Sequence, residues 1–123
     1  MPFPPITIKT SGTTVSDEQK SLLEQKLTSL NKYLGQETDI TCEAEFEKVA
    51  ARENGPIFRV EVNLMVAGKM HRAEATMESF AQAIDEVRDE LDKELRRKHK
   101  KQNTLLRKGG RKLKQLMRFG RSV

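Results

Sequence analysis

The chain has 123 residues, with 23 Lys and Arg against 18 Asp and Glu, a net charge of +5 and 36% hydrophobic residues. These values are typical of one small soluble domain, and they exclude a second domain or a deep cleft between two lobes. No apolar run approaches the ~20 residues of a membrane span, and residues 1–5 lack a signal-peptide pattern. The single cysteine, Cys42, excludes an intramolecular disulfide. We therefore expect a cytoplasmic protein without membrane contacts.

The first forty residues predict a strand followed by a helix. Residues 6–10 alternate apolar and polar side chains, as a short strand does, and Ser11-Gly12 ends the run. Ser16 and Gln19 form a capping-box pattern at the start of a helix over residues 16–34. Gly35 is typical of a helix end, and the apolar stripe recurs at spacings of four, three and four residues through Leu23, Leu27, Leu30 and Leu34.

Three more strands and a second helix are predicted after residue 40. Apolar and polar residues alternate over 40–47, 58–66 and 71–77, and these runs are separated by Asn54-Gly55-Pro56 and by a tight turn around Ala67-Gly68-Lys69. The second helix is expected to open near Glu78-Ser79. Its apolar stripe contains Phe80, Ile84, Val87, Leu91 and Leu95.

This order predicts an α+β fold of the type β-α-β-β-β-α. Because each strand has one apolar face and each helix one apolar stripe, both helices should cover the same face of a four-stranded, mostly antiparallel sheet. A right-handed crossover would make the first two strands parallel. The other sheet face is expected in water, and it should carry no aromatic residue for stacking on RNA bases but several acids, namely Glu43, Glu45, Glu47, Glu61 and Glu74.

Charge is divided along the chain. Residues 1–92 contain 10 Lys and Arg and 17 Asp and Glu, whereas residues 93–123 contain 13 Lys and Arg and one acid. An acidic body with a cationic end predicts binding to a polyanion, with nucleic acid favoured over a membrane surface or a merely solubilising tail. On the second helix the cations that should face away from the stripe are Lys93, Arg96, Arg97 and Lys100, flanked by Lys98 and Lys101.

Residues 1–102 are predicted to form the α+β domain, and residues 103–123 a basic flexible tail with a hinge at Gly109-Gly110. The tail could order on a partner as a short amphipathic helix. Its expected RNA-binding cations are Arg107, Lys108, Arg111, Lys112, Lys114, Arg118 and Arg121.

No catalytic or metal-binding constellation is found in the sequence. His71 is in phase with buried sheet residues, His99 lies among cations where it suits a phosphate contact, and Cys42 has an apolar phase and no metal partner at ligand spacing. We expect a protein that is not an enzyme, needs no cofactor or small-molecule substrate, and is a monomer when free.

The stretch Arg72-Ala73-Glu74, then residues 79–85 and the basic helix end through His99, resembles the ribosome hibernation-promoting factor and ribosome-associated translation inhibitor family, also called the sigma-54 modulation protein family. The resemblance covers about residues 6–101 and is closest to the short type. It implies the fold derived above and a stress-response role: occupying the mRNA and tRNA channel of the small ribosomal subunit through rRNA contacts, which inhibits translation.

The resemblance also implies rRNA-facing roles for Lys20, Lys26, Lys93, Arg97 and Lys98. The sequence departs from the family pattern at three positions, Ser29, Ala81 and Glu90. Two alternatives stay open at this point: a general double-stranded nucleic-acid-binding protein, and a protein-binding regulator of transcription.

Overall fold

A four-stranded sheet forms one layer of the molecule. The computed structural model describes the backbone of residues 3–35, 37–51 and 54–118, and side chains within these ranges up to residue 100. The strands lie in the order β1-β2-β3-β4, with β1 parallel to β2 and the other two pairs antiparallel. They are β1 (Ile6–Ser11), β2 (Ile40–Lys48), β3 (Phe58–Val66) and β4 (Lys69–Met77). The predicted α+β fold and its single parallel pair are confirmed.

The first helical segment consists of α1 (Asp17–Thr28) and a 3-10 turn, η1 (Ser29–Tyr33). The predicted capping box is present, since the Ser16 hydroxyl accepts from the Gln19 N–H and the Gln19 side chain accepts from the Ser16 N–H. The expectation of one helix over 16–34 is wrong in its last turn. Thr28 and Ser29 hydroxyls each donate at 2.6 Å to a carbonyl three or four residues back, and this competition with the backbone pattern accompanies the change to 3-10 winding.

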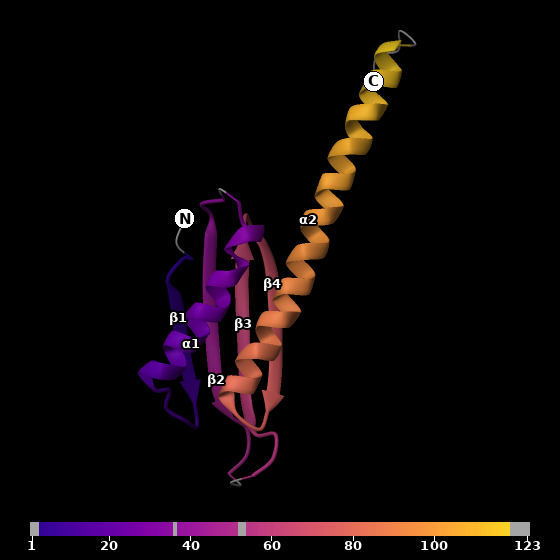
Figure 1. The fold of residues 1–123 in the computed structure, drawn as a ribbon. Helices are drawn as coiled ribbons and strands as arrows, with labels where there is room; N and C mark the ends of the chain where they lie inside the picture. Colours follow the sequence, from indigo (N-terminus) through magenta and orange to yellow (C-terminus); the bar gives the residue numbers. More distant parts are fainter. Residues whose placement is uncertain (1–2, 36, 52–53, 119–123) are drawn as a thin grey trace.

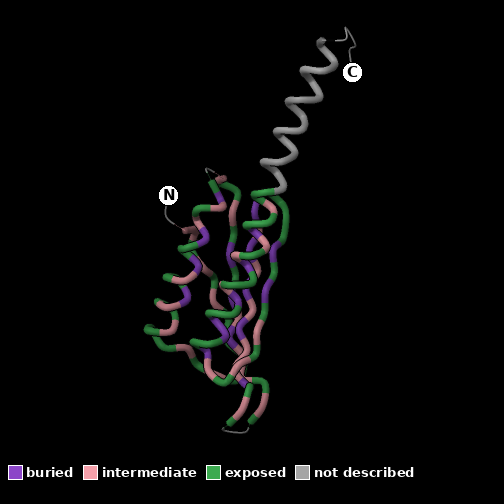
Figure 2. Tube along the Cα trace, turned by 45° about the vertical axis from the view of Figure 1, so that its right-hand side comes forward, coloured by how far each residue is buried: buried purple, intermediate pink, exposed green. Residues whose placement is uncertain are grey.

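Both helices cover one face of the sheet, and the other face is open, as Figures 1 and 2 show. The core lies between the two layers, where Phe46 and Phe58 make edge-to-face contacts with Phe80 at centroid distances of 5.1 and 4.9 Å. The predicted stripes of both helices are buried there. His71 is the buried polar residue of this core, with 1% exposure, among the side chains that the structure describes.

The turn between β3 and β4 has two residues, Ala67 and Gly68, and sets Val66 opposite Lys69. Their φ angles are +50° and +82°. Two positive φ values match the type I′ turn, whose twist suits an antiparallel pair. The turn predicted around Ala67-Gly68-Lys69 is therefore confirmed, and the start of β4 lies beside the middle of the second helix, where His71 is 3.0 Å from Glu94.

The second helix, α2 (Phe80–Arg118), has 39 residues. The Ser79 hydroxyl accepts from the Gln82 N–H at its start. At 1.5 Å per residue the helix is about 58 Å long, roughly twice the ~30 Å of a nine-residue strand, so α2 continues past the sheet (Figure 1).

The hinge expected at Gly109-Gly110 is wrong, because α2 runs through both glycines. A glycine costs a helix about 1 kcal/mol relative to alanine but keeps its N–H, and the neighbouring Leu, Lys, Arg and Gln residues are good helix formers. The division into a domain over 1–102 and a flexible tail over 103–123 stays a prediction.

Candidate nucleic-acid interface

Five cations lie together on α2 between residues 93 and 100, around Leu95, the last buried residue of the apolar stripe among the described side chains. Leu91 and Leu95 are 0% and 4% exposed, which turns the opposite side of the helix to solvent. We call these cations the basic end; four are exposed and Lys98 is half-buried. The basic end consists of Lys93, Arg96, Arg97, Lys98 and Lys100. The structure therefore brings the predicted cations of this helix together, while their role in binding stays a prediction.

Contacts within the basic end leave its charge at the surface. The Arg97 Nε donates to the Lys93 carbonyl oxygen at 3.3 Å, a contact that neutralises no charge. Arg96 lies 3.8 Å from the Asp92 carboxylate one turn earlier, with 61% of the Arg96 side chain exposed, so this pair is a weak one in water. These guanidinium groups are available to an anion.

Lys98 is placed differently from its expected position on the flank of the outward face. Its Nζ lies 3.5 Å from Nε2 of His71 on β4, and the Lys98 side chain is therefore directed along the body of the protein. The Nδ1 of His71 lies 3.0 Å from the Glu94 carboxylate, one helical turn before Lys98. Sequence analysis could not place this group because it depends on how α2 lies across β4.

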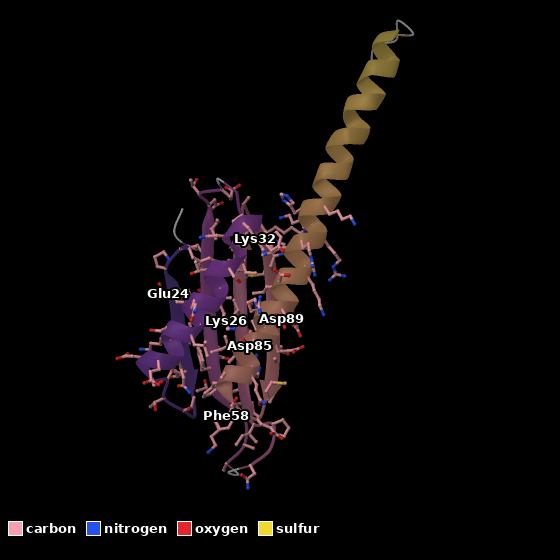
Figure 3. The ribbon with its side chains drawn as sticks, in the orientation of Figure 1. Glu24, Lys26, Lys32, Phe58, Asp85 and Asp89 are labelled. Carbon is pink, nitrogen blue, oxygen red and sulfur yellow. The ribbon has the colours of Figure 1, made fainter. Side chains whose placement is uncertain are left out.

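Lys26 of α1 is partly occupied by an ion pair. Its Nζ lies 3.0 Å from the Asp85 carboxylate, and Figure 3 shows the two side chains between α1 and α2. Lys20, by contrast, lines a groove with residues of β1 and with Glu24, and Figure 3 shows Glu24 on the side of α1 away from α2. The two predicted cations of α1 are thus separated from the basic end, and Lys26 also holds the two helices together.

Lys32 and Tyr33, which the sequence analysis did not assign to the interface, extend the basic end toward η1 through His99. Lys32 Nζ lies 5.2 Å from the centre of the Tyr33 ring, and the Tyr33 ring lies 6.4 Å from that of His99. Tyr33 and His99 border a small pocket of about 150 Å³ that Leu34, Glu37, Leu95 and Lys98 also help to line. Only the tertiary contact between η1 and α2 brings these side chains together.

The open face of the sheet has the opposite charge. Arg59 at its centre makes ion pairs with four glutamates, at 2.9 Å to Glu45, 3.4 Å to Glu47 and 2.7 Å to Glu74, and also with Glu61. These interactions raise the pKa of Arg59, and hydrogen bonding from Arg59 lowers that of Glu74. One guanidinium among four carboxylates leaves a net negative surface that repels phosphate.

Two further pKa shifts have local causes. Burial raises the pKa of the Cys42 thiol to about 12, so this cysteine stays protonated and packs as an apolar residue. Burial, with the charges of Glu86 and Glu74, raises the pKa of Glu90, which lies one turn before the basic end. Glu90 is thus the acid whose replacement would extend the basic end along α2.

Some features expected from the sequence lie outside the described side chains. The side chains of Lys101 and of the tail cations belong to this part of the chain, and Arg121 lies outside the described backbone as well. Within the described residues, no group of three or more His, Cys, Asp or Glu is placed to hold a metal ion. No helix in this same part of the protein has the length and apolar character needed to cross a membrane.

The family assignment rests on a sequence match over residues 6–103, which covers every strand and the part of α2 that packs on the sheet. The matching family is described as Sigma 54 modulation protein / S30EA ribosomal protein. The chain belongs to this family. It is a ribosome-associated family and not a family of enzymes. No curated protein matches the chain in sequence.

Two solved structures have the same fold. The N-terminal domain of Protein Y from Thermus thermophilus is 22% identical with a TM-score of 0.61, and the match covers 75% of this chain and 96% of that one. A ribosomal subunit interface protein from Coxiella burnetii is 18% identical with a TM-score of 0.59, and the match covers 75% of this chain and 93% of that one. At this identity the likeness establishes the fold.

Proposed function

We propose that this protein is a non-enzymatic translation inhibitor of the cytoplasm that binds rRNA of the small ribosomal subunit and fills the channel used by mRNA and tRNA. The observation that carries the proposal is the opposition of two surfaces: exposed cations at the basic end, and a net negative open sheet face. Such a charge distribution would favour one orientation in an RNA-lined channel, with the basic end against the phosphates. Membership of a ribosome-associated family supports the ribosome as the source of that RNA.

The mechanism is occlusion. Lys93, Arg96 and Arg97 can each neutralise a phosphate, since Arg97 donates to a backbone carbonyl and Arg96 makes a long 3.8 Å pair with Asp92 from a side chain that is 61% exposed. The compact body carried by α2 would then exclude mRNA and tRNA sterically. No base need be read, because phosphate contacts fix position while sequence readout needs base edges.

The tail is proposed to act as a further basic arm. The α2 backbone continues to Arg118, well beyond the sheet, and seven Lys and Arg residues lie between 103 and 123. An arm of this charge would follow rRNA phosphates outside the volume filled by the body. The domain over residues 1–102 would provide orientation, and the arm would add affinity that depends on salt.

The test is cosedimentation with purified small subunits at physiological ionic strength. The variant K93E/R97E should lose binding, and each lost phosphate contact should reduce the salt slope by about 0.7–0.9. The matched control K9E/K48E makes the same change in net charge on β1 and β2. Circular dichroism should show both variants folded. Equal loss of binding in the two variants would mean that net charge alone, and not the basic end, drives association.

Two competing outcomes are distinguished by the same protein preparation. If arbitrary RNA or DNA duplexes bind as tightly as small subunits do, the protein is a general nucleic-acid binder. If a pulldown yields RNA polymerase components and no ribosomal proteins, it is a regulator of transcription. Either result would overturn the proposal. A ribosome profile with and without added protein would show whether the subunits are sequestered.

A further inference from the structure

A buried histidine connects the acidic and basic parts of α2. His71 is 1% exposed and projects from β4 toward the helix layer. Its two ring nitrogens lie beside two side chains of α2 that are one turn apart: Nδ1 is 3.0 Å from the Glu94 carboxylate and Nε2 is 3.5 Å from Lys98 Nζ. Glu94 is 42% exposed, so the group reaches from the core to the surface.

The chemistry of the two partners fixes the proton on the ring. A lysine ammonium has three donors and no acceptor, so the Nε2 that faces Lys98 must accept and carries no hydrogen. The ring proton is then on Nδ1, where it donates to the Glu94 carboxylate. This arrangement satisfies both nitrogens of a neutral histidine, which a buried ring requires.

Protonation of His71 cannot preserve this arrangement. A second ring proton on Nε2 would point at the Lys98 ammonium, and two cations 3.5 Å apart would repel each other in a partly dry environment. The imidazolium would keep its hydrogen bond to Glu94 as an ion pair. Lys98 is the member that can move, because it has a long flexible side chain and is half-buried on the surface.

We propose that His71 and Glu94 are positioning residues: neutral His71 holds the Lys98 ammonium against β4, and protonated His71 releases it to an RNA phosphate. RNA binding by the basic end therefore strengthens as the pH falls. This inference rests on the proposed function for its consequence, but the switch itself is a property of the free protein. The switch would make the proposed ribosome-binding surface sensitive to the pH inside the cell.

Among the described residues, the charged and titratable groups around His71 and Lys98 come from the sheet, from α2 and from the segment after η1, where Glu37 lines the same small pocket as Lys98. Its neighbour across the sheet is Leu64 of β3, and the next residue in that row is Cys42 of β2, a thiol that stays protonated because its pKa is about 12. From α2, Glu94 and Lys98 face the ring. The chain has one other histidine, His99, which is exposed beside Tyr33 and must be removed in the test.

The first measurement uses the free protein with the H99Q substitution. Nitrogen-15 NMR of His71 should show the proton on Nδ1 near pH 8, and the Lys98 Cε and Nζ signals should change together with those of the His71 ring when the pH is lowered from about 8 to about 6. A proton on Nε2 near pH 8, or Lys98 signals that ignore His71, would overturn the proposal. Neither result depends on ribosome binding.

The second measurement is the salt dependence of small-subunit binding at the two pH values. In H99Q, one added phosphate contact should steepen the slope of log K against log salt by about 0.7–0.9 at the lower pH. The double variant H71Q/H99Q should lose this change, because a glutamine amide can donate to Glu94 and accept from Lys98 at both pH values.

The variant K98M/H99Q keeps the test decisive if H71Q does not fold. It should also lack the change in slope, because it has no Lys98 ammonium to release. A pH-dependent slope that persists in K98M/H99Q would refute the role of Lys98. If the NMR signals behave as expected but no form binds small subunits, the positioning of Lys98 stands and the proposed function fails.

Discussion

Arg59 and Arg97 carry the same charge and belong to regions of opposite character. On the open sheet face Arg59 is surrounded by Glu45, Glu47, Glu61 and Glu74 and has 19% of its side chain exposed. On the basic end Arg97 is exposed, and its described contact is a hydrogen bond to the Lys93 carbonyl. Arg59 is therefore a structural cation that its own protein satisfies, whereas Arg97 can satisfy an external anion.

The difference teaches that charge counts alone do not locate a binding surface. The open face gathers five cross-strand charges by strand register, since Arg59 lies between Glu47 and Thr76 and Glu61 lies between Glu45 and Glu74. Helix α2 gathers charges by sequence proximity, and most of its acids come before most of its cations. The same fold thus separates the two signs onto different surfaces, which orients the molecule in an external field.

Removing the tail should give the largest effect on binding. Truncation after Gln102 removes seven cations, and the salt slope should fall by about 0.7 for each one that contacts a phosphate. The free energy of unfolding should stay within about 0.5 kcal/mol, because Leu95 is the last buried residue among the described side chains of α2. Urea denaturation measures the stability of the truncated protein, and cosedimentation measures its binding to small subunits. A large loss of stability would show that the tail is part of the folded domain.

Exchanging the two arginines for leucine should separate stability from binding. R59L should reduce the free energy of unfolding by about 2 kcal/mol, because four carboxylates lose the cation between them. R97L should change it by less than about 0.5 kcal/mol and reduce ribosome binding. Urea titration and cosedimentation of both variants measure this crossed pattern. Arg59 would be misassigned if R59L weakened binding while the stability stayed constant.

The interaction between Arg59 and Glu74 predicts how the stability of the protein depends on pH. Arg59 lowers the pKa of Glu74 in the folded protein, so the stabilisation is present above the ordinary glutamate pKa of about 4.3 and is lost as the pH falls through the lowered value. R59L should show a smaller loss of stability on acidification than the wild-type protein does. Thermal melts across this pH range provide the measurement.

Extending the basic end should have the smallest effect. E90K replaces an acid whose pKa is raised by burial and by Glu86 and Glu74, so the change removes a repulsion and adds a cation one turn before Lys93. Small-subunit affinity should rise by roughly threefold to tenfold, with a salt slope steeper by about 0.7–0.9. E43K makes the same charge change on the open face and serves as the control. Equal gains in the two variants would show that position is irrelevant.

Most of the fold could be predicted from sequence because its signals are local. Alternation over residues 58–66, the capping box at Ser16 and the turn at Ala67-Gly68 each depend on neighbours within a few residues. Two local predictions were wrong. The first helix changes from α1 to the 3-10 turn η1 at Ser29, and α2 continues through Gly109-Gly110. In both cases the conformational preferences of a few residues differ by small free energies, and the sequence pattern alone does not show which conformation is the more stable.

The candidate site was only partly predictable. Helical periodicity placed Lys93, Arg96 and Arg97 on the outward side of α2, since that depends on the position of the buried stripe alone. The positions of Lys98 beside His71, of Lys26 beside Asp85, and of Tyr33 beside His99 were not accessible in this way. Each joins elements that are distant in sequence.

By itself the sequence determined the order of elements, the apolar faces, the separation of acids from cations and the family. The tertiary structure decided which charges are used internally and which stay available, because an ion pair forms only where packing brings two groups within a few ångströms. Helix α2 crosses β4 so that one lysine reaches a buried histidine while its neighbours face water. This difference between neighbouring lysines depends on the angle and register with which α2 packs on the sheet, which no single segment of the sequence encodes.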